Sequence, residues 1–126
     1  AVLYGQLRQR GIGVRYVHAT GNEADISVAD LVEVVAGDPG IAVIALYLEN
    51  ITDALRLEAA AQRARDAGQL VFAVKAGASA SGQKAAQSHT GALASDDAVV
   101  NAFLERIGVC RVDTLRALVD VVPLAL

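Results

Sequence analysis

The longest apolar run of the chain, residues 41–48, constrains the fold more than any other segment. It is continuously apolar and rich in β-branched side chains, which is typical of a strand that is covered on both faces. Helical patterns flank this run, and a second apolar run at residues 70–75 follows the next helix. Strands that alternate with helices predict a parallel sheet with helices on both faces, so we expect an α/β fold.

Capping and turn residues predict where the other elements begin and end. Ser27 and Asp30 have the spacing of a capping box and begin a helix through residue 36, which Gly37 ends. The remaining expected elements are a helix over 1–10, a strand over 14–19, a helix from Thr52 or Asp53 to 68, a helix over 96–107, a short strand over 109–112, and a final helix from Thr114 that is disturbed near Pro123.

The expected order of elements begins with a helix, whereas doubly wound sheets normally begin with a strand. The helix at 1–10 also has no visible capping residue. We therefore expect that a first strand and turn precede Ala1 and are missing from this chain. Residues 1–126 are interpreted as a single domain that is a fragment of a larger multidomain protein or subunit.

Composition limits the classes of protein to which the chain can belong. With 126 residues, of which 54% are hydrophobic, it is long enough for one domain with a core and short for two. The net charge is −3 and the eleven Lys and Arg residues are scattered, so no basic surface for nucleic acid or an anionic membrane is predicted. No apolar run approaches the roughly 18 to 20 residues that span a bilayer. We expect a cytoplasmic protein that binds neither nucleic acid nor membrane.

Residues that commonly ligate metals are few. Cys110 is the only cysteine, which excludes an internal disulfide and a cysteine-rich zinc site. The two histidines, His18 and His89, are distant in the chain, so no metal site is predicted. Cys110 is interpreted as a buried thiol, and His18, within the expected strand at 14–19, as a structural residue.

One histidine is placed where it can carry out chemistry. The segment Ser88-His89-Thr90-Gly91-Ala92-Leu93 puts it among small residues, ahead of the expected helix start at Asp96 and Asp97. Backbone N–H groups and a helix N-terminus can hold the charge of a phosphoryl group on such a histidine. The pattern points to phosphoryl transfer, although an isolated histidine in such a loop is more often an ordinary surface residue.

Several motifs occur together in an order that resembles a known family. The motifs are Tyr4, Gly21-Asn22-Glu23-Ala24-Asp25, Leu46-Tyr47-Leu48-Glu49, Lys75-Ala76-Gly77 and Ser88-His89-Thr90-Gly91-Ala92-Leu93-Ala94. With them, nearly the whole chain resembles the succinyl-CoA-synthetase-like, flavodoxin-fold domain of NDP-forming acyl-CoA synthetases, a group that includes ADP-forming acetyl-CoA synthetase. The resemblance implies a flavodoxin-like fold.

The resemblance also implies roles for individual residues. His89 would accept a phosphoryl group from an acyl phosphate and pass it to a nucleoside diphosphate, with Glu49 orienting its ring. The residues implied in substrate or phosphate binding are Tyr4, Asn22, Thr90, Gly91 and Ala92. Competing interpretations are that Glu49 caps the following helix, that Tyr4 only packs, and that Asn22 belongs to a polar turn. Because few cationic residues are expected nearby, main-chain dipoles would stabilise the phosphoryl charge.

The implied reaction requires parts that this chain does not contain. It converts acyl-CoA, phosphate and ADP into a carboxylic acid, CoA and ATP, with magnesium bound elsewhere. A CoA-binding Rossmann domain and an ATP-grasp domain would come from the same polypeptide or a partner subunit, in an oligomer. The isolated domain is expected to bind no cofactor and to be inactive. Ser95-Asp96-Asp97 departs from the Gly-Ser-Asp that is common in the family, so rate or substrate range could differ.

Two other functional classes remain open from the sequence. The first is a synthetase-like, acyl-CoA-sensing regulatory region of a protein lysine acetyltransferase, although the presence of His89 counts against it. The second is a non-catalytic flavodoxin-like binding module such as a receiver domain. A receiver domain needs an acidic cluster with an aspartate at a strand end, and no such cluster is apparent in the sequence.

Overall fold

The computed structural model describes residues 2–17, 27–76 and 97–126. Most elements begin and end close to where the sequence predicts them. The elements are α1 (Val2–Gln9), α2 (Val28–Val35), β1 (Val43–Leu48), α3 (Ala54–Asp66), β2 (Leu70–Lys75), α5 (Asp97–Arg106), β3 (Cys110–Val112), α6 (Leu115–Val121) and the short 3-10 helix η1 (Val122–Ala125).

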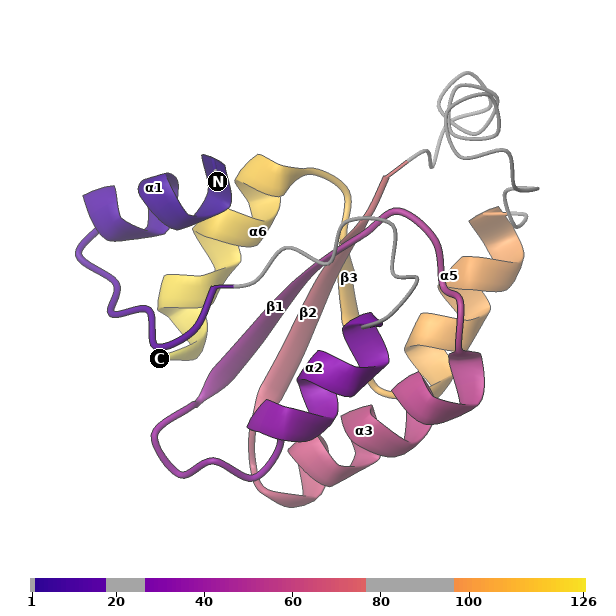
Figure 1. Cartoon of the computed structure of the whole chain (residues 1–126). Coiled ribbons are helices and arrows are strands. Elements are labelled where there is room, and N and C mark those ends of the chain that lie inside the picture. Colours follow the sequence, from indigo (N-terminus) through magenta and orange to yellow (C-terminus); the bar gives the residue numbers. More distant parts are fainter. Residues whose placement is uncertain (1, 18–26, 77–96) are drawn as a thin grey trace.

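The described strands form one parallel sheet in the order β1-β2-β3. Helices α2, α3 and α5 cover one face of this sheet, and α1 and α6 cover the other (Figure 1). The expected α/β architecture with a parallel sheet is therefore confirmed. Among the described residues β1 has a strand neighbour on one side only, and its other edge is unpaired.

Side chains of β1 and β2 alternate between the two layers of helices. Ile44, Leu46 and Leu48 are buried in the larger core cluster, beneath α2 and α3. On the opposite face, Phe72 and Val74 pack against Leu118 of α6. Each fully buried leucine contributes about 1.5–3 kcal/mol to folding. Burial on both faces therefore holds β1 and β2 between the two layers of helices.

Local capping interactions explain why the helices begin and end where they do. The Ser27 hydroxyl accepts from the Asp30 N–H at 3.1 Å, and the Asp30 carboxylate accepts from the Ser27 N–H at 2.9 Å, which confirms the capping box. Gly37 follows α2 with a φ of +86°, a conformation that favours glycine. Asp53 caps α3 and Thr114 caps α6 through side-chain oxygens.

Two expectations about the fold are wrong. Residues 14–17 form no strand, and the rest of the expected strand at 14–19 lies outside the described residues. A strand needs a neighbour for its backbone hydrogen bonds, and no described strand lies beside 14–17. Cys110 is exposed rather than buried, because it lies on the short edge strand β3, which has a described neighbour on one side only.

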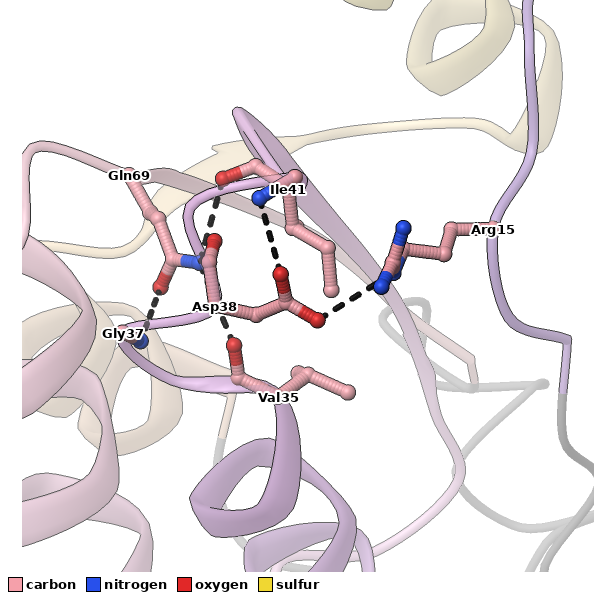
Figure 2. Close-up of polar contacts among 7 residues, drawn as sticks. Arg15, Val35, Gly37, Asp38, Ile41 and Gln69 are labelled. Carbon is pink, nitrogen blue, oxygen red and sulfur yellow. Dashed lines mark hydrogen bonds and ion pairs between the residues drawn. The ribbon is translucent and has the colours of Figure 1, made fainter.

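A buried glutamine holds together the turn at the amino end of β1. Gln69 is 3% exposed, and its amide nitrogen donates to the carbonyls of Val35, Asp38 and Ile41 at 3.1–3.2 Å. Its amide oxygen accepts from the Gly37 N–H at 3.1 Å (Figure 2). Arg15 reaches the same turn through an ion pair with Asp38 at 3.2 Å. The turn between α2 and β1 is therefore fixed to the residue that precedes β2.

The Asp30 carboxylate in the capping box of α2 should make the stability of the fold depend on pH. The backbone hydrogen bond from Ser27 lowers the pKa of Asp30, and Arg56 lowers it further through an ion pair. A carboxylate with a depressed folded-state pKa stabilises the fold above its unfolded pKa of about 3.9, and this contribution is lost as pH falls through the folded value. Asp30→Asn should therefore be less stable than the parent chain at pH 7, and the gap should close below about pH 4. Urea unfolding followed by circular dichroism at several pH values measures this gap, and a gap that stays constant with pH would contradict the prediction.

Candidate functional site

The residues proposed from the sequence fall into two groups. His89, Thr90, Gly91, Ala92 and Asn22 lie outside the described residues, so their roles stay predictions. Glu49 and Tyr4 are described.

Glu49 directly follows β1, at the carboxyl edge of the sheet. It is exposed, and Asp53 rather than Glu49 caps the following helix α3. Its position therefore does not arise from helix capping. In open α/β sheets ligands bind beyond the carboxyl ends of the strands, and Glu49 lies at that edge.

Tyr4 lies on α1 and is 42% exposed. Helix α1 is held against α6, with an ion pair of 2.6 Å between Arg10 and Asp120. Figure 1 shows α1 beside α6 and apart from the segment between β1 and α3.

The described residues place an unexpected group of charges at the carboxyl edge. This group, which we call the carboxyl-edge cluster, consists of Glu49, Lys75, Asp97 and Arg111. Lys75 is the last residue of β2 and is only 7% exposed, and its Nζ donates to the Ala76 carbonyl at 2.8 Å. Arg111 of β3 forms an ion pair of 2.5 Å with Asp97, the first residue of α5.

Register explains why these charges gather. Leu48 pairs with Lys75 across β1 and β2, and Ala73 pairs with Arg111 across β2 and β3. Glu49, Lys75 and Arg111 therefore lie at or near the ends of three adjacent parallel strands. The sequence predicts few cationic groups near the site. Lys75 enters the sequence-based interpretation only within a motif of the family resemblance, and neither Lys75 nor Arg111 is given a role in it. A lysine that ends an otherwise apolar run was the available signal.

The electrostatics of the cluster centre on Lys75. Burial lowers the pKa of its ammonium group, and the nearby Arg111 lowers it further, while Asp97 and Glu49 act in the opposite direction. A buried cation is stabilised by any anion that reaches it.

Next to this edge, the carboxyl end of β1 borders a small pocket. It lies among Ser27, Leu48, Asn50 and Asp53, at the beginnings of α2 and α3, with a volume of about 10 Å³. That volume accommodates about one water molecule, so this pocket is no substrate site.

Within the described ranges, no three His, Cys, Asp or Glu side chains gather to hold a metal ion. No helix there is long and apolar enough to cross a membrane.

Comparisons with known proteins identify the family. The family model described as "Succinyl-CoA ligase like flavodoxin domain" matches residues 1–125. A trans-feruloyl-CoA synthase from an unknown prokaryotic organism is 40% identical over 126 residues, which are 100% of this chain and 18% of that protein. The ADP-forming acetate–CoA ligase of Methanocaldococcus jannaschii is 35% identical over 113 residues, which are 90% of this chain and 16% of that protein.

A solved structure agrees with this match. The dinucleotide forming acetyl-coenzyme A synthetase 1 of Ca. Korarchaeum cryptofilum, in complex with phosphate and ADP, superposes with a TM-score of 0.86 at 28% identity. The superposition covers 94% of this chain and 26% of that one. The chain thus spans a minor part of the length of these relatives. It belongs to the family of succinyl-CoA ligase like flavodoxin domains.

Proposed function

We propose that this chain is the phosphohistidine-bearing domain of an NDP-forming acyl-CoA synthetase, an acid–thiol ligase that converts acyl-CoA, phosphate and ADP into a carboxylic acid, CoA and ATP. The family match over residues 1–125 and the ADP-forming ligases among its relatives support this function. The single structural observation that supports it is the carboxyl edge, where Glu49 directly follows β1, next to β2, the last described strand before the His89 motif in the sequence.

In this proposal His89 is the nucleophile. A neutral imidazole nitrogen attacks the phosphorus of an acyl phosphate, a P–N bond forms, the P–O bond to the acyl group breaks, and the carboxylate leaves with the bonding electrons. A terminal phosphate oxygen of ADP then attacks the same phosphorus, and the P–N bond breaks to regenerate the imidazole and give ATP. Each step conserves the phosphoryl group, and no redox partner is needed.

Other residues position the reacting groups. The Glu49 carboxylate accepts a hydrogen bond from the second ring nitrogen of His89 and so fixes the tautomer. Backbone N–H groups of Thr90, Gly91 and Ala92 hold the phosphoryl oxygens, with Asn22 and Tyr4 contacting phosphate or substrate. The exposure of Glu49 supports this role, since its carboxylate is accessible to a neighbouring segment and makes no hydrogen bond within the described ranges.

The chain acts as one domain of a larger cytoplasmic assembly. A CoA-binding Rossmann domain and an ATP-grasp domain, in the same polypeptide or a partner subunit, supply the sites for CoA and for ADP or ATP with magnesium. The relatives exceed this chain several-fold in length, which is consistent with such additional domains. The isolated 126 residues are inactive, and the complete enzyme is an oligomer.

Labelling with radioactive ATP tests this function. The full-length protein, incubated with γ-labelled ATP and magnesium, should acquire phosphate that is labile in acid and stable in base, as a P–N bond requires. Peptide mapping should place it on His89. Glu49→Gln should slow labelling, because the amide orients the ring less effectively than the carboxylate. Acid-stable label, or label on any other residue, would overturn the proposal.

A further inference from the structure

Lys75 is a buried cation with few partners. Its side chain is 7% exposed, and its one hydrogen bond to a described residue is to the neutral carbonyl of Ala76 at 2.8 Å. An ammonium group carries three donors, so two of them have no acceptor within the described residues. Charged groups are rarely buried to this extent unless they are paired. Within the described residues, no negatively charged group contacts the Lys75 ammonium group.

The carboxylates of the carboxyl-edge cluster do not supply that anion. Asp97 is engaged by Arg111 at 2.5 Å, and the Arg111 side chain is itself only 12% exposed. Glu49 is exposed and forms no ion pair with the Lys75 ammonium group. Within the part of the chain that the structure describes, Arg111 and Asp97 therefore pair with each other, and Lys75 is a cation at this edge without an ion-pair partner.

We propose that Lys75 is a phosphate-binding residue, whose ammonium group contacts phosphate at the carboxyl edge of the sheet. The identity of the anion rests on the proposed function, in which phosphate is a substrate. The burial of the Lys75 ammonium group and its lack of an ion-pair partner are observations on the described residues alone. Binding places a phosphate oxygen against Nζ, where the low polarity of the surroundings strengthens the attraction. Lys75 would thus supply a side-chain cation for phosphate at this edge of the sheet, whereas from the sequence main-chain dipoles are expected to stabilise the phosphoryl charge.

A purely structural role makes a different prediction. In that case the stem of Lys75 fills space at the end of β2 and Nζ only tethers Ala76. Lys75→Met retains an unbranched stem without charge, Lys75→Gln retains a donor without charge, and Lys75→Arg retains the charge. Arg63→Met removes the same charge from an exposed position on α3 and serves as the control.

Calorimetric titration of the full-length protein with inorganic phosphate separates the two roles. Lys75→Met and Lys75→Gln should raise the Kd for phosphate about 10- to 100-fold, which corresponds to the loss of one charged hydrogen bond. Lys75→Arg should stay within several-fold of the parent, and Arg63→Met should bind as the parent does. If Lys75→Met does not fold, Lys75→Gln is compared with Lys75→Arg, because both side chains can donate a hydrogen bond and only Arg retains the positive charge.

Each outcome can be read independently of the proposed function. Parental affinity for phosphate in both Lys75→Gln and Lys75→Met, or no phosphate binding by the parent protein, would overturn the role of Lys75. Labelling of His89 in the same protein reports on the proposed function separately. A protein that binds phosphate through Lys75 yet never labels His89 retains this inference and loses the function.

Discussion

Full-length protein that carries His89→Asn should lose turnover by about 1,000-fold or more, since the residue proposed to form the covalent intermediate is removed. The amide nitrogen of asparagine has its lone pair delocalised into the carbonyl, so it cannot attack phosphorus. The side chain is smaller but still polar, and the fold should therefore persist. Steady-state formation of ATP from acyl-CoA, phosphate and ADP measures the effect.

The other histidine provides a matched control. His18→Asn makes the same chemical change at a position interpreted as structural, and turnover should stay within a few-fold of the parent. Circular dichroism of both variants shows whether they fold. Turnover by His89→Asn above a tenth of the parental rate would exclude a phosphohistidine at this position.

Gln69→Leu should lower the free energy of unfolding of the 126-residue chain by about 2–4 kcal/mol. Leucine has a similar size, but it leaves the Gly37 N–H without its partner and deprives the carbonyls of Val35, Asp38 and Ile41 of a donor. The Ile41 carbonyl is the most affected, because Val35 and Asp38 also accept backbone hydrogen bonds from the same turn. Urea unfolding followed by far-ultraviolet circular dichroism measures the loss.

A second glutamine shows whether the effect depends on burial. Gln62 lies exposed on α3 and donates to Asp66 at 2.8 Å, so Gln62→Leu should change stability by no more than about 0.5 kcal/mol. Gln69→Glu should also destabilise, because it replaces the donating amide group with an oxygen that faces three carbonyls. A Gln69→Leu chain as stable as Gln62→Leu would show that the hydrogen bonds of Gln69 contribute little.

Elements whose signals are local could be predicted from the sequence. Ser27 with Asp30, Gly37 and Thr114 each act on backbone groups within a few residues, so the spacing of the residues is enough to place the helix ends. Residues 14–17 show the limit of this reasoning. Their apolar pattern is compatible with a strand, but a strand forms only where a partner accepts its hydrogen bonds.

Contacts between distant segments could not be predicted in the same way. Strand register places Lys75 and Arg111 near each other at one edge of the sheet. Because they are far apart in the sequence, this proximity could not be predicted from local patterns. Gln69 resembles an ordinary polar linker residue until the turn 28 to 34 residues earlier folds against it. The His89 motif was noticed from its small-residue surroundings, its detailed role came from the resemblance to a family, and it lies outside the described residues.

The edge of β1 that has no strand neighbour among the described residues has a consequence for handling the chain. Its six residues, Val-Ile-Ala-Leu-Tyr-Leu, contain neither a charge nor a proline, the two features that usually discourage a strand from recruiting another. Where no other strand covers this edge, its backbone amide and carbonyl groups can pair with a strand of a second molecule, so self-association would increase with protein concentration. Dilution should therefore keep molecules of this chain apart where this edge is left uncovered.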